Sequence, residues 1–272
     1  EIDAYGESSV DGKYHRRICI KQPVSGVPGK RIFRRNNLVG TSSLLNPDDR
    51  LVKAYALEKY WKAVERTEVD CDTLPNLLAA QDISSVDFLK TDLEGLDFEV
   101  IKSCEAWLGG IQFIQAELRF EPLYETERPF HEVVSYLANF GYEVLDITHI
   151  DRWVYKTSHR FTQVEGRATW GDFIFVLSPD RLEAAKKVAI GDQKTLADRR
   201  ARCMATFQAM GVIPAKVLAK IGKRAVDEHA RAAVQLNAVD GPGLPSGKGE
   251  AVGHHQAVLH PPVCFFGKHS ID

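Results

Sequence analysis

The sequence lacks the cysteine pattern of a disulfide-bonded or zinc-binding protein. Five cysteines are scattered over 272 residues, and no two of them form a C-x-x-C pair. An odd, dispersed set is typical of a reducing compartment and argues against both disulfides and a structural zinc site. We therefore expect a cytoplasmic protein. The cysteines are Cys19, Cys71, Cys104, Cys203 and Cys264.

Long apolar runs and an excess of one charge are also missing. No stretch approaches the roughly 20 apolar residues that span a bilayer, and no signal peptide is visible. The formal net charge of −2 gives no general attraction to nucleic acid or to an anionic membrane surface. The sequence thus excludes neither enzymes nor small-molecule binders, but it predicts no nucleic-acid partner and no membrane span.

The C-terminal part lacks the periodicity of the rest. Residues 181–210 and 214–236 have the spacing of two amphipathic helices, whereas the chain from residue 240 is rich in Gly, Pro and His without any period. The histidines there have no standard metal-ligand spacing, so no metal site is predicted. We expect an α/β domain at 1–179, a helical appendage at 180–238 and a disordered tail at 239–272.

What the sequence does contain is an alternation of strand and helix patterns in its middle. The predicted strands are 86–91, 111–118, 142–148 and 172–177, and helices are predicted at 96–108 and 129–140. Such alternation indicates parallel pairing through crossover helices. The last two strands have no helix between them, which favours an antiparallel pair at one edge. The expected fold is α/β, with a Rossmann-like, mostly parallel sheet.

Patterns before residue 86 are shorter. Strands are predicted at 17–25, 31–34 and 67–71, helical segments at 51–66 and 73–80, and a loop at 40–45. Tyr55, Tyr60 and Trp61 in the first helical segment have the composition of a sugar-stacking surface, but core packing is the simpler interpretation.

Two carboxylates and a lysine stand at the end of the strand at 86–91. Ligands of open α/β sheets bind outside the carboxyl ends of the strands, and Asp92 and Glu94 occupy such an end, with Gly95 permitting a tight turn. The alternative is that the two acids cap the following helix and that Lys90 is their salt-bridge partner. A spaced pair exceeds what capping requires, so a functional role is the preferred hypothesis.

Glu117 ends the next apolar run. Adjacent strand ends would bring Asp92 and Glu117 within reach of one ligand, an arrangement that suits a general base acting on a hydroxyl, or a bound cation. The alternative is a solvated edge carboxylate near Arg119, and the sequence does not decide between them. His149, after the strand at 142–148, is more simply interpreted as a solvated loop side chain.

These motifs resemble those of the FkbM-type methyltransferases. The resemblance rests on K-T-D-L-E-G at 90–95, on E-V-I-K-S in the helix that follows, and on a next strand closing in Glu117. Weaker matches are G-T-S-S-L at 40–44, D-T-L at 72–74 and D-F-I-F at 172–175. Together they cover about residues 1–178.

The resemblance implies a class I methyltransferase that uses S-adenosylmethionine. It implies methylation of a hydroxyl on a sugar, glycan or related metabolite, with Asp92 at the boundary of cofactor and acceptor. Glu94 and Glu117 would orient the acceptor or remove its proton. Asp92, Ser42 and Ser43 would contact the cofactor.

The chain departs from the class I pattern at its start. The first strand and the Gly-rich turn that cradle the cofactor are absent, and E-I-D-A at 1–4 resembles the acidic end of the second strand. Glu1 would then bind the ribose hydroxyls, and the missing turn would lie upstream of a sequence that does not begin with Met. Without it, weak cofactor binding is expected, and a non-catalytic α/β domain that binds a ligand or partner is the alternative function. A dehydrogenase is disfavoured because no G-x-G-x-x-G is present.

Overall fold

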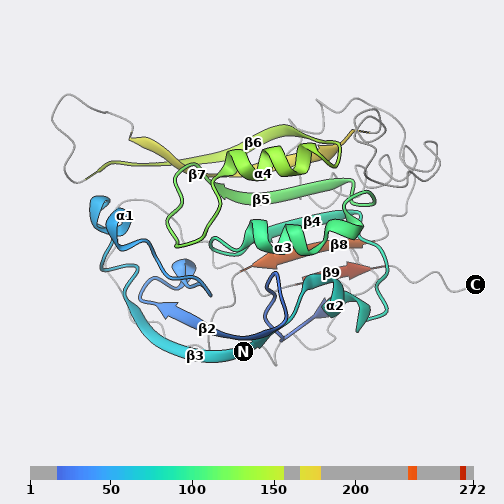
Figure 1. Ribbon diagram of the computed structural model, residues 1–272, viewed down its shortest axis with the longest axis horizontal. Coiled ribbons are helices and arrows are strands. Elements are labelled where there is room, and N and C mark those ends of the chain that lie inside the picture. The colour runs from blue at the N-terminus through green and yellow to red at the C-terminus, as the bar shows by residue number, and fades with distance from the viewer. Residues whose placement is uncertain (1–16, 156–165, 179–231, 238–263, 268–272) are drawn as a thin grey trace, which may run out of the picture.

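A mixed seven-stranded sheet organises the part of the chain that the computed structural model describes, which is residues 17–155, 166–178, 232–237 and 264–267. Its strand order is β1-β9-β8-β4-β5-β7-β6 (Figure 1). The strands are β1 (Arg17–Cys19), β4 (Phe88–Asp92), β5 (Phe113–Arg119), β6 (Tyr142–Trp153), β7 (Arg167–Leu177), β8 (Ala232–Asn237) and β9 (Cys264–Gly267). A separate antiparallel ribbon consists of β2 (Gly29–Asn36) and β3 (Ala63–Cys71).

The helices are short and lie between the strands in sequence. They are α1 (Asp49–Ala54), α2 (Leu74–Ala79), α3 (Asp97–Ser103) and α4 (Phe130–Ala138), with 3-10 turns η2 (Val39–Thr41) and η3 (Glu105–Trp107). Local sequence explains their limits. Asp48 and Thr73 accept backbone hydrogen bonds at the starts of α1 and α2, and Gly141 with φ of 83° follows α4. Among the described residues, no helix has the length and apolar character needed to cross a bilayer.

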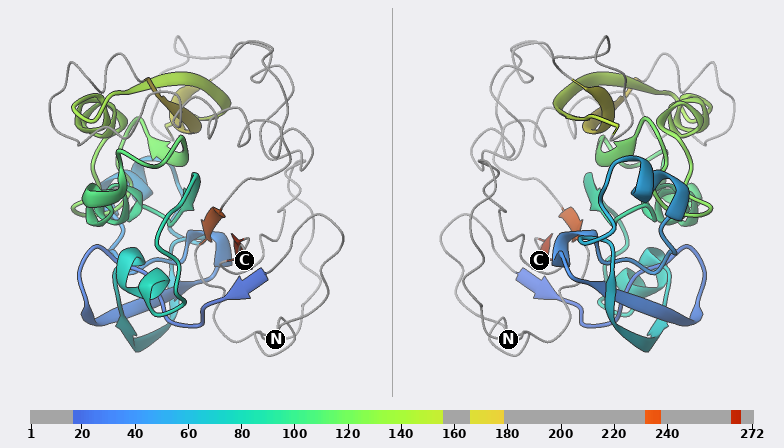
Figure 2. Two further views of the ribbon diagram at one scale, coloured as in Figure 1. Left: turned by 90° about the vertical axis from the view of Figure 1, so that its right-hand side faces the viewer. Right: turned by 90° about the vertical axis from the view of Figure 1, so that its left-hand side faces the viewer.

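The main core lies between α3, α4 and one face of the sheet. Figure 2 shows both helices on the same side of the sheet. Leu89, Ile114 and Ala116 alternate with residues of the opposite face and pack beneath Val100 and Val133 of the helices, all of them buried. The other face at β4 and β5 carries Lys90, Asp92, Glu117 and Arg119, which is why the polar residues there share one side.

The predicted alternation of strands and helices around β4, α3, β5, α4 and β6 is confirmed, and so is the antiparallel pairing of β6 with β7. The prediction of a mostly parallel sheet is wrong. In the sheet that the described residues form, only β4–β5 and β4–β8 are parallel pairs. The physical reason is that β7 returns from β6 as a hairpin and inserts beside β5, so its direction is reversed relative to both neighbours.

Two element predictions in the N-terminal part of the chain also need correction. The predicted strand at 17–25 is limited to Arg17–Cys19. The helical segment predicted at 51–66 ends at Ala54, because Ala56 adopts a φ of 59° that no helix continues through, and β3 begins at Ala63.

At the C-terminal end, 232–237 is strand β8 where a helix was predicted, and Cys264–Gly267 within the predicted tail is strand β9. The sequence there places apolar residues at every second position, Ala232, Val234 and Leu236, which is the period of a strand. Pairing of β8 with β4 also provides hydrogen-bond partners for backbone groups that an unpaired sheet edge would leave without them. The predicted helix at 181–210 lies outside the described residues, and the division of the chain into three parts stays a prediction.

Tyr142 provides a test of the core. Its side chain is 1% exposed, and its hydroxyl lies 2.6 Å from the Leu108 carbonyl oxygen and 2.7 Å from that of Ile111. Tyr142→Phe leaves these carbonyls without the hydroxyl donor, so the free energy of unfolding is expected to fall by about 1–3 kcal/mol in urea titrations. Tyr136→Phe is the control, since its hydroxyl bonds the exposed Glu105. Equal losses in the two variants would contradict this account.

Candidate functional site

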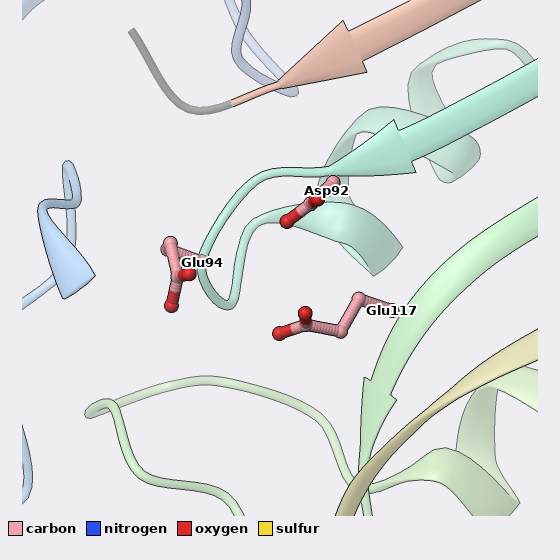
Figure 3. Close-up of side chains that lie close together, drawn as sticks. All are labelled: Asp92, Glu94 and Glu117. Carbon is pink, nitrogen blue, oxygen red and sulfur yellow. The ribbon is translucent and has the colours of Figure 1, made fainter. Parts of the chain in front are cut away.

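Three carboxylates meet at the carboxyl ends of β4 and β5. Asp92 is the last residue of β4, Glu94 follows in the turn to α3, and Glu117 stands two residues before the end of β5. Because β4 and β5 are parallel and adjacent, these ends share one edge of the sheet. Figure 3 shows the three side chains pointing toward a common space. One carboxylate oxygen of each lies within 4.8 Å of the others.

An unusual turn aims Glu94 at this space. Glu94 has a φ of 49° and Gly95 a φ of 94°, both in the left-handed region that favours glycine. A Cβ at residue 95 would lie 2.9 Å from the ring of Tyr124, so only glycine permits this approach. The Ser43 hydroxyl donates to the Glu94 carbonyl oxygen at 2.8 Å and fixes the turn from the other side. The turn is therefore held by contacts on both sides.

Ser42 and Ser43, predicted to contact the cofactor, are buried at 1% and 3% exposure. The Ser42 hydroxyl oxygen accepts the Asn36 backbone N–H at 3.0 Å, and that of Ser43 accepts the Leu45 N–H at 3.0 Å. Ser42 thus holds its loop to the end of β2, and Ser43 holds it against the Glu94 turn. A cofactor contact by these residues stays a prediction. Glu1, predicted to bind the ribose, lies outside the described residues.

Arg119 holds the carboxylates together. Its Nη2 lies 2.6 Å from Glu94 Oε2 and 3.1 Å from Glu117 Oε1, and its Nε lies 3.0 Å from Glu127 Oε1. The guanidinium is 4% exposed, and its centre lies 5.4 Å from the centroid of the Tyr124 ring. A buried guanidinium requires several partners, and here it has three carboxylates and an aromatic face.

Residues of the segment after β5 complete this network. The Tyr124 hydroxyl lies 2.9 Å from Glu94 Oε2 and 2.8 Å from the Thr41 carbonyl oxygen. Glu127 Oε2 accepts the backbone N–H groups of Leu123 and Tyr124 at 2.8 and 3.1 Å. Tyr124 and Glu127 were not singled out from the sequence. The available signal was that an arginine ending a buried strand needs partners.

Two sequence alternatives fail. Helix α3 begins after Leu96 without any side-chain cap, so Asp92 and Glu94 do not cap it. Glu117 is not a solvated edge carboxylate, since its side chain is 13% exposed and ion-paired with Arg119. Lys90 pairs with no carboxylate among the described residues, and Arg119 holds the cluster instead.

The acidic charge exceeds the basic charge in this cluster. Burial raises the pKa of Glu94 to about 8 against the opposing effect of Arg119, and it raises the pKa of Glu117 well above its ordinary value. Burial also raises the pKa of Asp97, in the first turn of α3, to about 7. Burial lowers the pKa of Arg119, but its three carboxylate partners outweigh burial and raise it well above its ordinary value. The cluster therefore binds protons more tightly than isolated carboxylates do.

A cleft of about 280 Å³ opens beside Glu94, Glu117 and Arg119. Asp92 is adjacent to these carboxylates but does not line the cleft. Aromatic side chains dominate the remainder of the wall. They include Tyr60 and Trp61, for which core packing was the simpler interpretation, and Trp153 and Trp170, which the sequence did not single out. The other lining residues are Leu38, Gly40, Thr41, Leu57 and Asp151.

The arrangement can do two kinds of chemistry. A buried carboxylate with a raised pKa is a stronger base than a free one and can take a proton from a hydroxyl. Three carboxylate oxygens this close are also ligands that a hard cation prefers. Arg119 already pairs with two of the three, which supports the first use.

Comparison with known families gives one result. Residues 34–144 match the family model described as the methyltransferase FkbM domain. The match runs from β2 to the start of β6 and includes Asp92, Glu94, Glu117 and Arg119. No curated protein and no solved structure matches the chain significantly.

The raised pKa values predict a pH-dependent stability. The carboxyls of Glu94 and Asp97 hold protons in the folded state that the unfolded chain releases above its ordinary pKa values of 4.5 and 3.8. Their stabilisation is complete below those values and is lost as the pH rises through about 7 for Asp97 and about 8 for Glu94. The free energy of unfolding, measured with urea across this window, is therefore expected to fall as the pH rises.

Asp97→Asn removes one of these groups and should flatten the slope of stability against pH. Asp82→Asn is the matched control, because Asp82 is exposed and its φ of 57° suits asparagine. If the two variants keep the same slope as the unaltered chain, the assignment of the proton to this cluster is wrong.

Proposed function

We propose that this chain, which carries a methyltransferase domain of the FkbM type at residues 34–144, transfers a methyl group from S-adenosylmethionine to a hydroxyl of a sugar, a glycan or a related metabolite. The observation that carries the proposal is the meeting of Asp92, Glu94 and Glu117 at the ends of two parallel strands, beside a cleft of about 280 Å³. In α/β sheets this edge is where ligands bind. The proposed setting is the cytoplasm.

The residues at this edge fit the chemistry of the cofactor. S-adenosylmethionine supplies, when bound, an electrophilic methyl group on a positively charged sulfur. Asp92 offers a carboxylate where such a cation requires negative charge, and no described residue donates a hydrogen bond to its side chain. We assign Asp92 to the cofactor side, because it stands next to the cleft without lining it.

Glu117 is the proposed base. Burial raises the pKa of its carboxyl well above the ordinary value, so its carboxylate form is a stronger base than a solvated carboxylate. As the acceptor oxygen bonds to the methyl carbon, Glu117 takes the hydroxyl proton, and the carbon–sulfur bond breaks with its electron pair left on sulfur. The charge that the base gains and the sulfonium loses cancel within the site.

Glu94 has a different proposed part. Its Oε2 is engaged by Arg119 and by Tyr124, so this side chain is fixed and orients the acceptor rather than taking the proton. Arg119 sets the distance between Glu94 and Glu117 by pairing with both. Positioning of this kind contributes much of the rate in a bimolecular transfer.

A non-catalytic domain that binds a ligand or partner is the second candidate. The observation that favours it is the internal use of Ser42 and Ser43, whose hydroxyls are engaged by the protein's own backbone. Cofactor binding and turnover decide between the two candidates.

Cofactor binding is tested by calorimetry with S-adenosylhomocysteine, the product of the transfer. We expect weak but saturable binding by the 272-residue chain. With S-adenosylmethionine as the ligand, Asp92→Asn should lose about tenfold or more in affinity, because the contact between a carboxylate and the positively charged sulfur is removed. Asp82→Asn should bind as the unaltered chain does. Absence of binding, with the fold intact by circular dichroism, would favour the non-catalytic domain.

The base is tested by replacing Glu117 with glutamine, which keeps the shape and removes the basic oxygen. Turnover, followed as S-adenosylhomocysteine release in the presence of the acceptor, should fall by about 10²-fold or more. Affinity for S-adenosylhomocysteine should stay within a few fold. Glu68→Gln, on exposed β3, is the control. A Glu117→Gln variant with full turnover would remove this residue from the mechanism.

A further inference from the structure

One row of side chains crosses the sheet at the floor of the cleft. Arg119 of β5 is the register partner of Trp170 of β7, and Trp170 is the register partner of Asp151 of β6. Side chains in register on neighbouring strands stand on the same face. All three line the cleft, so an arginine, an indole and a carboxylate are presented side by side.

Asp151 is linked to the aromatic wall. Its Oδ2 accepts the indole N–H of Trp153 at 2.8 Å, and its Oδ1 accepts the backbone N–H of Arg152 at 2.9 Å. Each carboxylate oxygen can accept a second hydrogen bond. Trp153 in turn meets the edge of Trp61 with ring centroids 5.8 Å apart. The wall therefore combines the flat apolar faces of the indoles with the Asp151 carboxylate, which can accept further hydrogen bonds from a ligand.

A second set of contacts holds this wall in place before any ligand binds. Tyr55 packs edge-on against Trp153 at 5.6 Å and stacks on Tyr155 at 4.4 Å. The hydroxyls of Tyr55 and Tyr155 donate to the two carboxylate oxygens of Glu121, at 2.5 and 2.6 Å. Because these rings are fixed, little side-chain entropy is lost when a ligand stacks on them.

The charge of the cleft selects among ligands. Glu94, Glu117 and Asp151 line it with Arg119 as the one cation among the described lining residues, and Arg119 is already paired with two of these carboxylates. An anionic ligand would meet the carboxylate of Asp151 and a guanidinium that is already paired, whereas hydroxyl groups would find acceptors.

We propose that Asp151, Trp153 and Trp170 form a subsite for the ring of the acceptor, and that this ring is a polyhydroxylated pyranose without an acidic group. One C–H face of the ring stacks on indole, and a ring hydroxyl donates to Asp151. This inference rests on the proposed function in one respect, since the hydroxyl that receives the methyl group must extend from this ring toward Glu117. The binding itself requires no methyl donor.

The test is therefore a binding experiment without cofactor. Three of the four tryptophans in the sequence line the cleft, so intrinsic fluorescence reports on its occupancy. The probes are the methyl α-glycosides of glucose, galactose and mannose, and the methyl glycoside of glucuronic acid. We expect saturable binding of at least one neutral glycoside and an affinity for the glucuronide that is lower by about tenfold or more.

Variants assign the contacts, with calorimetry as the readout because tryptophan itself is changed. Asp151→Asn keeps the shape and the acceptor for Trp153 but loses the charge, and it should weaken glycoside binding by about tenfold. Trp170→Ala should weaken it by a similar factor, and Trp107→Phe, outside the cleft, should not change it.

Binding of no neutral glycoside, equal binding of the glucuronide, or unchanged affinity in Asp151→Asn would each overturn the subsite. Glycoside binding that depends on Asp151 in a chain that neither binds S-adenosylhomocysteine nor releases it would leave the subsite standing and remove the methyl transfer instead.

Discussion

The ion pairs of Arg119 are the interaction on which the site depends. A guanidinium that is 4% exposed would be costly to bury alone, and the carboxylates of Glu94, Glu117 and Glu127 would be costly without it. The pairs join the turn after β4, the end of β5 and the segment before α4. The positive φ of Glu94 and the close approach of Tyr124 to Gly95 follow from the same requirement, because Glu94 must reach Arg119. Three carboxylates share this single guanidinium, and the pKa values of the Glu94 and Glu117 carboxyls stay raised despite the pairing.

Much of the acidic edge formed by Asp92, Glu94 and Glu117 follows from the sequence. The apolar runs before Asp92 and Glu117 determine two buried strands, and consecutive parallel strands bring those acids to one edge by geometry alone. Arg119, Tyr124 and Glu127 could not be assigned in the same way, because each matters through partners far away in the chain. The position of β7 between β5 and β6 could not be predicted either, since a hairpin return determines the direction of the strand but not the second strand beside which it inserts. Trp153 and Trp170 reach the cleft through the pairing of β6 with β7, which continues as far as Trp153 and Arg167.

The residues that line the cleft come from two parts of the chain. Glu94, Glu117 and Arg119 lie within the region that matches the family model, whereas Asp151, Trp153 and Trp170 follow it. The residues proposed for the transfer and those proposed for acceptor binding thus come from different segments that meet only in the folded sheet. Functional variation concentrates in loops and extensions carried by a rigid scaffold, and the β6–β7 hairpin has that relation to the strand ends of β4 and β5.

The pairing of β4 with β8 has a consequence for how the molecule assembles. Residues 88–92 are register partners of residues 233–237, so one neighbour of the strand that bears Asp92 arrives from very late in the chain. Contacts between such distant segments require closure of a long loop and form slowly compared with local ones. During synthesis, β4 and β5 can pair with each other and pack against α3 and α4 before β8 has been made. We therefore expect the acidic edge to reach its final form among the last steps of folding.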